Sequence, residues 1–170
     1  FEDLRVPAEN ILGKVDGGFS IANERLTRNR IPYAAACLGV AMRAQDMAIE
    51  YVKIRETFGD LLATRQTVQN MLIDNEMDIR TARWLTLAAA HKADQGEPFR
   101  TEAAMAKIAA TEAGGRVVDR AMQIHGGYGV TKEFPFERWF REMRIRRIGE
   151  GPNEVQRLII ARDLIGGSFH

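Results

Sequence analysis

The sequence predicts an all-α fold, an antiparallel four-helix bundle with one additional short helix. Three observations lead to this prediction. Long segments carry apolar residues at intervals of three and four, which is helical periodicity. Glycine pairs, or glycine next to proline, separate these segments and supply helix stop signals. The connections between the segments are short, which favours antiparallel neighbouring helices.

The first predicted helix follows Gly17 and Gly18 and spans residues 19–55. Its apolar positions recur every three, four or seven residues, at Ala34, Leu38, Ala41, Ala48 and Val52. Pro32 lies inside this segment, where it removes a backbone donor and disfavours helix at the residue before it. We therefore expect a kink there, or two abutting helices.

The second and third helices follow in the same manner. The second should span about residues 65–95 and stop at Gly96 to Pro98. Its apolar stripe contains Val68, Met71 or Leu72, Asn75, Ile79 and Ala82. The third should span about residues 101–124, and the glycines from Gly126 onwards end it. The alanine-rich faces of these helices allow close packing.

Two elements remain at the carboxyl end. A shorter helix is expected over residues 135–148. The last helix should begin near Pro152, because proline is favoured in the first turn, and should end at Gly166 and Gly167. Residues 1–16 resemble an extended tail or a strand remnant, which leaves residues 17–170 for the bundle.

Composition narrows the class of protein. A chain of 170 residues with 45% apolar side chains is expected to form one domain. The net charge of +1 provides no overall field that would attract nucleic acid or an acidic membrane. The single cysteine, Cys37, excludes an intrachain disulfide and is expected in the core. The longest apolar run, residues 33–38, is too short to span a membrane. The start without Met or signal segment indicates a piece of a longer protein.

The glycine cluster Gly126, Gly127 and Gly129 has two interpretations. It lacks the Gly-Lys-Ser/Thr ending of a phosphate loop, and it follows a helix instead of a strand. A helix cap therefore explains it most simply, since glycine adopts positive φ at low cost. The alternative is that exposed backbone N–H groups in this cluster contact a ligand.

The segment 138–147 contains five arginines and one glutamate, with Trp139 and Phe140 among them. Such a segment could bind single-stranded nucleic acid. Its apolar residues recur near helical spacing, however, which favours an amphipathic helix with a solvated basic face. The histidines at 91, 125 and 170 have no neighbouring His or acidic pair, so we expect no metal site.

Glu150 lies between Gly149 and Gly151, immediately before the helix that Pro152 opens. Flanking glycines let the backbone approach a ligand and leave the carboxylate unshielded. Alternatively, Glu150 complements the positive end of the following helix. From the residues alone, Glu150 is a weak catalytic candidate.

The order of short motifs along the chain resembles the C-terminal domain of the acyl-CoA dehydrogenases. The resemblance covers essentially the whole chain, and no motif carries it alone. The matching stretches are residues 1–7 with 10–13, Gly18 with Phe19, Arg30 with Ile31, 55–59 with Gln66, 104–107, 123–129, 135–138, and Glu150 and Gly151 with 155–157.

This resemblance implies an enzyme that converts an acyl-CoA thioester to the trans-2-enoyl-CoA, with FAD as hydride acceptor. Residues 1–16 would then be the end of a middle β domain and a linker. Glu150 would be the catalytic base, since a closed apolar site can raise the pKa of a carboxylate toward that task. The base position of another branch of the family falls here on Asn29, which cannot act as a base.

The resemblance also implies positions for FAD and substrate. The expected FAD contacts are Arg55, Phe58, Gln66, Gln123, Gly126, Gly127, Pro152 and Glu154. Arg55 would reach the pyrophosphate of the neighbouring subunit's FAD, a role that suits a guanidinium fork. Arg30 and Gly151 would lie near the substrate. Pro152 departs from the usual Thr, so a flavin contact is lost or rearranged, and the substrate cannot be carried over from straight-chain enzymes.

The implied partners are an acyl-CoA, an electron-transfer flavoprotein and further copies of the chain in a homodimer or homotetramer. The implied location is the cytoplasm in a bacterium, or the mitochondrial matrix or peroxisome in a eukaryote. We expect the isolated domain to be inactive and to bind FAD poorly. Two alternatives remain open: an acyl-CoA oxidase or flavin monooxygenase of the same superfamily, and a helical domain that serves only assembly.

Overall fold

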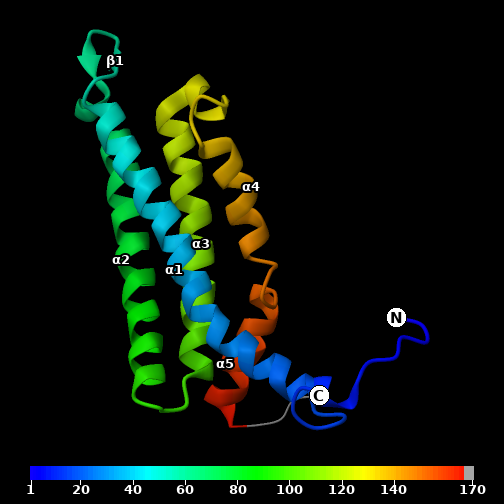
Figure 1. Cartoon of the computed structure of the whole chain (residues 1–170). Coiled ribbons are helices and arrows are strands. Elements are labelled where there is room, and N and C mark those ends of the chain that lie inside the picture. Colours follow the sequence, from blue (N-terminus) through cyan, green and yellow to red (C-terminus); the bar gives the residue numbers. More distant parts are fainter. Residues whose placement is uncertain (167–170) are drawn as a thin grey trace.

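The computed structural model describes residues 1–166 and has an all-α fold, as predicted. Five α-helices lie within these residues: α1 (Gly18–Val52), α2 (Gln66–Asp94), α3 (Arg100–His125), α4 (Phe136–Arg146) and α5 (Asn153–Ile165). The first three lie side by side, while α4 and α5 follow one another along α3 (Figure 1). The predicted helices differ from the observed ones by only a few residues at most boundaries.

The two carboxyl-terminal helices share the fourth position of the bundle. α4 has 11 residues and α5 has 13, about half the length of the 26-residue α3. The last helix, α5, is therefore short, and α4 and α5 together fill the position of a fourth long helix. α5 ends at Gly166, which adopts a left-handed conformation (φ 69°) and caps it. The expected end at Gly167 lies outside the described residues.

Pro32 does not divide α1, which continues as one helix of 35 residues. In Figure 1 the axis of α1 turns in its blue amino-terminal part, the part of the helix that contains Pro32. Proline has no N–H, so the carbonyl of Arg28 four residues earlier loses its helical partner. The expected kink is therefore present, but the alternative of two abutting helices is not.

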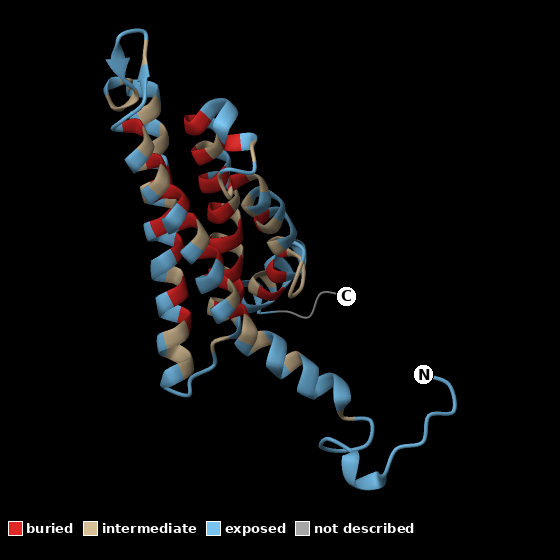
Figure 2. Cartoon of the chain, turned by 45° about the horizontal axis from the view of Figure 1, so that its top comes forward, coloured by how far each residue is buried: buried red, intermediate tan, exposed pale blue. Residues whose placement is uncertain are grey.

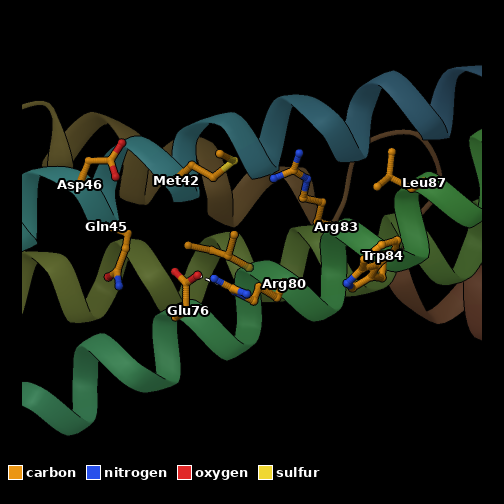
Figure 3. A pocket seen from close by; sticks show the side chains of 9 residues that line it. Met42, Gln45, Asp46, Glu76, Arg80, Arg83, Trp84 and Leu87 are labelled. Carbon is orange, nitrogen blue, oxygen red and sulfur yellow. Dashed lines mark hydrogen bonds and ion pairs between the residues drawn. The ribbon is translucent and has the colours of Figure 1, made fainter.

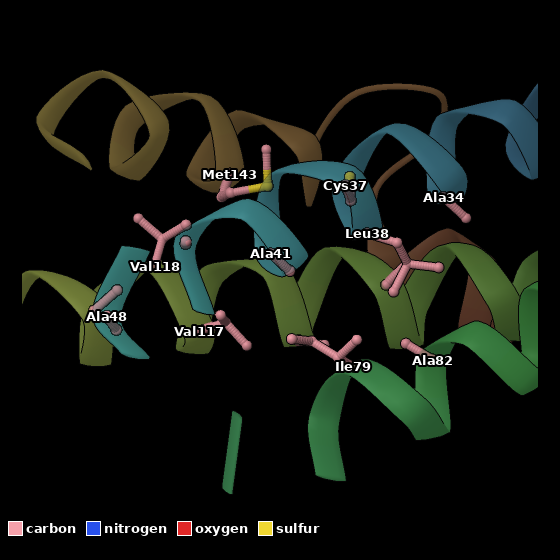
Figure 4. Packing of buried hydrophobic residues seen from close by; sticks show 14 of the residues in the cluster. Ala34, Cys37, Leu38, Ala41, Ala48, Ile79, Ala82, Val117, Val118 and Met143 are labelled. Carbon is pink, nitrogen blue, oxygen red and sulfur yellow. The ribbon is translucent and has the colours of Figure 1, made fainter. Parts of the chain in front are cut away.

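Small side chains hold α1 and α3 close together. The buried alanines of the two helices include Ala34, Ala41 and Ala48 on α1 and Ala106, Ala110 and Ala113 on α3. Figure 4 shows Ala41 and Ala48 of α1 beside Val117 and Val118 of α3, with Ile79 of α2 reaching toward them. α3 contacts all four other helices, so the core follows its length, as the buried residues in Figure 2 show.

A short β-hairpin joins α1 to α2, and the sequence analysis did not anticipate it. β1 (Glu56–Thr57) pairs antiparallel with β2 (Asp60–Leu61). Both central residues of the turn have positive φ, 51° at Phe58 and 81° at Gly59, which matches the right-handed twist of a hairpin. The hairpin projects beyond the end of α2 (Figure 1), and a 3₁₀ turn, Leu62–Thr64, follows it.

Residues 1–17 extend away from the bundle (Figure 2) and contain only one 3₁₀ turn, Ala8–Asn10. The side chains of Phe1, Leu4 and Leu12 are exposed. An apolar side chain is stabilised when it leaves water. We therefore expect this tail to be covered in the complete protein.

α4 is amphipathic, as expected of the basic segment. Phe136 and Met143 are buried against the bundle. Two of its arginines pair with acidic residues one turn away on the same exposed face, Arg138 with Glu142 and Arg141 with Glu137. The basic residues therefore form the solvated side of a packed helix.

Candidate active site

Glu150 lies in the loop between α4 and α5, in a backbone conformation that is uncommon for residues other than glycine. Its φ is 58°, and Gly151 follows with a φ of 84°. Such strained residues concentrate at functional sites, where the surrounding structure holds them. The Glu150 carboxylate accepts a hydrogen bond at its Oε1 from Asn29 Nδ2 at 3.3 Å. Its other oxygen, Oε2, is buried and has no partner in the described chain.

Arg30 of α1 lies beside this loop and is only 3% exposed. Its Nε and Nη1 are buried without a hydrogen-bond partner among the described residues. Burial and the nearby Arg100 lower the pKa of Arg30, while the negative Glu150 opposes this effect. Buried polar groups are normally paired, so unpaired atoms on both Arg30 and Glu150 indicate room for a polar ligand.

Gln156 of α5 holds the loop through hydrogen bonds to its backbone. Its Nε2 donates to the backbone oxygens of Glu150 at 3.3 Å and Gly151 at 3.0 Å. A Cβ at position 151 would lie 2.7 Å from this nitrogen. Gly151 therefore combines a positive φ with a close contact, and a larger residue would strain the backbone and displace the Gln156 amide.

Lys107 of α3 reaches the same loop from the core. Its ammonium donates to Arg147 O at 3.2 Å, Gly151 O at 3.0 Å and Asn153 Oδ1 at 2.8 Å. The side chain is fully buried. Burial lowers the pKa of Lys107 to about 8. All three ammonium protons are directed to the Glu150 loop or to the first residue of α5.

Tyr33 holds the other side of the loop. A Cβ added at Gly149 would lie 2.5 Å from the Tyr33 hydroxyl, so the phenol packs directly on that glycine. The Arg146 guanidinium lies 4.6 Å above the centre of the Tyr33 ring. Burial raises the pKa of Tyr33. The loop is thus fixed between α1 and α3.

Sequence reasoning did not assign a role to Lys107, Asn153, Gln156 or Tyr33. Lys107 and Gln156 were inside the matched motifs, which was the only signal available. Their hydrogen bonds join residues far apart in the chain, and such contacts leave no periodic pattern.

A second group of expected site residues lies at the hairpin end of the bundle. Arg55, Gly126 and Gly127 line an open hollow of about 490 Å³. The other residues around it are Tyr51, Thr57, Leu62, Ile124, His125, Tyr128 and Thr131. The Arg55 side chain is exposed and makes no hydrogen bond or ion pair within residues 1–166. Gly126 ends α3 with a φ of 60°, so the helix-cap interpretation is confirmed.

Three more expected residues belong to this end. Phe58 is 99% exposed at the tip of the hairpin, again with positive φ. Gln66 begins α2, and Gln123 lies in the last turn of α3; both are exposed. An exposed, strained aromatic residue has no role in the core of the bundle and is available for contact with a ligand or another subunit.

The structure does not bring all the expected site residues together. Pro152 and Glu154, at the start of α5, lie with Glu150 and Gly151 near Arg30. Arg55 and its neighbours lie beyond the other end of α1. At about 1.5 Å of rise per residue, Arg30 and the last residue of α1, Val52, are about 33 Å apart. An extended dinucleotide is shorter than this distance.

A second hollow, here called the α1–α2 groove, has a volume of about 480 Å³. Figure 3 shows its lining residues, which are Met42, Gln45, Asp46, Glu76, Ile79, Arg80, Arg83, Trp84 and Leu87. Trp84 is 72% exposed, and charges of both signs surround it. Contiguous apolar surface with a polar rim marks interaction sites.

Within residues 1–166, His, Cys, Asp and Glu side chains form no group of three that could hold a metal ion. His170, one of the three histidines considered, lies outside the described residues. The helices in the same range are too short or too polar to cross a membrane.

Comparison with known proteins identifies the family. Residues 16–165 match the family model described as the acyl-CoA dehydrogenase C-terminal domain. The chain belongs to the acyl-CoA dehydrogenase family. This acyl-CoA dehydrogenase domain is 44% identical over 165 residues to the mitochondrial short-chain specific acyl-CoA dehydrogenase of Bos taurus, covering 97% of this chain and 40% of the relative.

Solved structures agree with this assignment. The butyryl-CoA dehydrogenase of Megasphaera elsdenii is similar with a TM-score of 0.93 and 43% identity, over 97% of this chain and 43% of that one. A structure titled as the electron transferring flavoprotein of Acidaminococcus fermentans contains a chain with a TM-score of 0.95 and 42% identity, over 98% of this chain and 44% of that one. The acyl-CoA dehydrogenase domain thus spans about two-fifths of the relatives it matches.

Proposed function

We propose that this domain is part of an FAD-dependent enzyme that dehydrogenates an acyl-CoA to the trans-2-enoyl-CoA, with Glu150 as the catalytic base. One observation carries the proposal. The backbone of Glu150 has a positive φ, and the Oε2 atom of its carboxylate is buried without a hydrogen-bond partner. Beside it, the Nε and Nη1 atoms of Arg30 are also buried without a partner among the described residues. An acyl-CoA thioester offers a carbonyl oxygen that can accept from Arg30 and an α C–H that can face the carboxylate. The identity to short-chain acyl-CoA dehydrogenases supports the same reaction.

The chemistry assigns different tasks to the residues of the loop. Asn29 donates to Oε1 of Glu150, which orients the carboxylate and leaves Oε2 to take the α proton. Asn29 thus occupies the alternative base position but supports Glu150 instead. FAD supplies the acceptor for the hydride that leaves the β carbon. Arg30 and the N–H groups of the loop hold substrate near the base.

The residues at the hairpin end fit the phosphates and aromatic rings of FAD. Arg55 offers an unpaired guanidinium fork, and Gly126 and Gly127 leave their backbone open to a ligand, since a Cβ at either would meet no other atom within 4 Å. Phe58 adds an exposed aromatic ring, and Gln66 and Gln123 add exposed amides. Pro152 and Glu154 would contact the cofactor at the other end.

The separation of the two ends supports sharing of FAD between subunits. The stretch of α1 from Arg30 to Val52 alone spans about 33 Å, so one extended FAD would not reach both ends of the same chain. Each end would therefore contact a different FAD, and a neighbouring copy would complete each site. The α1–α2 groove provides a surface for such a copy, since exposed Trp84 and Leu87 lie there among charges of both signs.

The comparisons favour further details of the reaction. The relatives named for short-chain and butyryl substrates support a short acyl-CoA. The similarity to a chain in the structure of the electron transferring flavoprotein of Acidaminococcus fermentans supports electron-transfer flavoprotein as the partner that removes electrons. The name of the Bos taurus relative supports a mitochondrial matrix location if the source is a eukaryote, and a bacterial protein would be cytoplasmic. Residues 1–16 would be the end of a preceding β domain.

The full-length Glu150→Gln variant tests the proposal. We expect it to keep bound flavin but to lose the bleaching of flavin absorbance by butyryl-CoA without oxygen, because an amide cannot accept the α proton. Glu142→Gln, a change of a half-exposed carboxylate on α4, serves as the control and should bleach normally. Normal bleaching by Glu150→Gln would refute the base assignment. Rapid return of flavin colour in air alone would favour the oxidase alternative.

A further inference from the structure

Lys107 is a charged residue whose burial the core does not require. It is the eighth of the 26 residues of α3, and none of its side chain is exposed. Within residues 1–166 no ion pair joins it to a carboxylate, and its ammonium is surrounded by neutral acceptors. Burying a charge is costly unless it is both paired with an opposite charge and hydrogen-bonded, so an apolar side chain of similar length would pack here at lower cost. The cost indicates a task outside packing.

The acceptors of Lys107 flank Glu150 on both sides. Two of them are the backbone oxygens of Arg147 and Gly151, which precede and follow the glutamate. The third is the side chain of Asn153, the first residue of α5. A single ammonium thereby connects the end of α4, the Glu150 loop and the start of α5.

Asn153 is itself held in place. Its amide nitrogen donates to Thr111 Oγ1 at 3.1 Å and to Glu112 Oε1 at 2.9 Å, both on α3. These bonds direct the Asn153 oxygen toward Lys107. The network is therefore anchored on a long helix that the core fixes from several sides.

We infer that Lys107 is a positioning residue that holds Glu150 in the conformation required to take the α proton. This inference rests on the proposed function. Glu150 and Gly151 have positive φ values, which the loop adopts only when its surroundings enforce them. Without the ammonium, the oxygens of Arg147 and Gly151 lose a shared donor. The loop can then relax toward ordinary φ values and move the carboxylate away from Arg30.

The test uses the full-length flavoprotein with Lys107→Met, which preserves length and removes the donors. We expect the flavin content to stay stoichiometric and the dissociation constant for butyryl-CoA to change less than threefold. The first-order rate constant of flavin reduction should fall at least tenfold. Lys92→Met, which removes an ion pair between α2 and α3 away from the loop, is the matched control and should reduce flavin at the wild-type rate.

A second measurement separates positioning from general stability. Amide hydrogen exchange of residues 148–151 should become at least tenfold faster in Lys107→Met, while the core of α1 and α3 stays protected. Equal acceleration across the bundle, or an unchanged rate of flavin reduction, would contradict positioning. Should Lys107→Met not fold, Asn153→Ala decides the matter, because it removes one acceptor and should show a smaller loss of the same kind.

The outcomes of the two proposals can be told apart. Bleaching by Glu150→Gln would overturn the catalytic base, whatever Lys107 does. A wild-type rate of reduction in Lys107→Met, together with no bleaching in Glu150→Gln, would overturn only the positioning role. Slow reduction with unchanged substrate binding in Lys107→Met, together with no bleaching in Glu150→Gln, supports both.

Discussion

His125 shows how burial changes the chemistry of a single residue. It is 3% exposed, and its ring stacks on Tyr51 with 4.3 Å between centroids. The rings of Phe134 and Phe136 also contact the His125 ring, with their planes tilted relative to it. Its Nδ1 lies 2.8 Å from the carbonyl oxygen of Ala121, which only accepts, so Nδ1 carries the hydrogen. Burial lowers the pKa of His125 from its usual 6.5.

This lowered pKa predicts a pH dependence of stability. As pH falls through 6.5, the unfolded chain binds a proton at His125 before the folded chain does, so the free energy of unfolding decreases. His125→Phe keeps a ring but removes the titration. We expect the unfolding temperature of the full-length wild type to fall more between pH 7.5 and pH 5 than that of the variant. Equal falls would contradict the prediction, whatever the variant's stability at pH 7.5.

The Glu150 loop has a recognisable local sequence, but the residues around it come from distant parts of the chain. Its glycines and its position before Pro152 could be recognised in the sequence. The sequence did not show that Asn29, Arg30, Lys107 and Gln156 surround it. These residues come from three helices, and only the packing of those helices brings their side chains to one loop.

At the scale of elements, α1 and α3 depend on small side chains at their contact. Ala41 is fully buried between α1 and its neighbours (Figure 4). Cores packed to this density leave no room for added methylene groups. The buried positions of α1 also coincide with its predicted apolar stripe, which explains why the period of the sequence located the helix correctly.

Ala41→Leu should therefore destabilise the protein by about 1–3 kcal/mol, although leucine is more apolar than alanine. Ala36→Leu, the same exchange at an exposed position of the same helix, should change stability by less than about 0.5 kcal/mol. Denaturant unfolding of the two full-length variants measures the difference. Equal stability would show that the contact between α1 and α3 can expand.

The elements that sequence reasoning missed have a common cause. β1 and β2 contain two residues each, too few to establish an alternating pattern. The sequence therefore did not predict the hairpin turn at Phe58 and Gly59. α5 was located correctly at both ends, but its contribution to the bundle depends on α4, which completes the same layer along α3.

At the scale of the whole molecule, the α1–α2 groove is the surface that predicts assembly. An aromatic side chain as exposed as Trp84 gains stability when another protein covers it. The groove also contains Arg80, which pairs with Glu76, together with Arg83 and Asp46, so a second copy of the same face can meet it with charges of both signs (Figure 3).

Trp84→Glu should shift the full-length protein toward smaller oligomers, because burying an added carboxylate in the interface opposes association. Sedimentation velocity at several protein concentrations measures this shift. Lys132→Glu, an exposed exchange outside the groove, controls for the added negative charge and should leave the distribution unchanged. An unchanged distribution in Trp84→Glu would place the subunit interface elsewhere.

Local patterns in the chain were sufficient for the fold class, the helix boundaries and the identity of Glu150 as a candidate, because periodicity, glycine stops and a motif's order are properties of neighbouring residues. Tertiary packing decided that Lys107 and Gln156 support Glu150. It also decided that Arg30 and Arg55 lie toward opposite ends of α1, where Arg30 and Val52 are about 33 Å apart. The reason is physical: hydrogen bonds and distances between helices depend on how their faces pack, and that arrangement exists only in the folded chain.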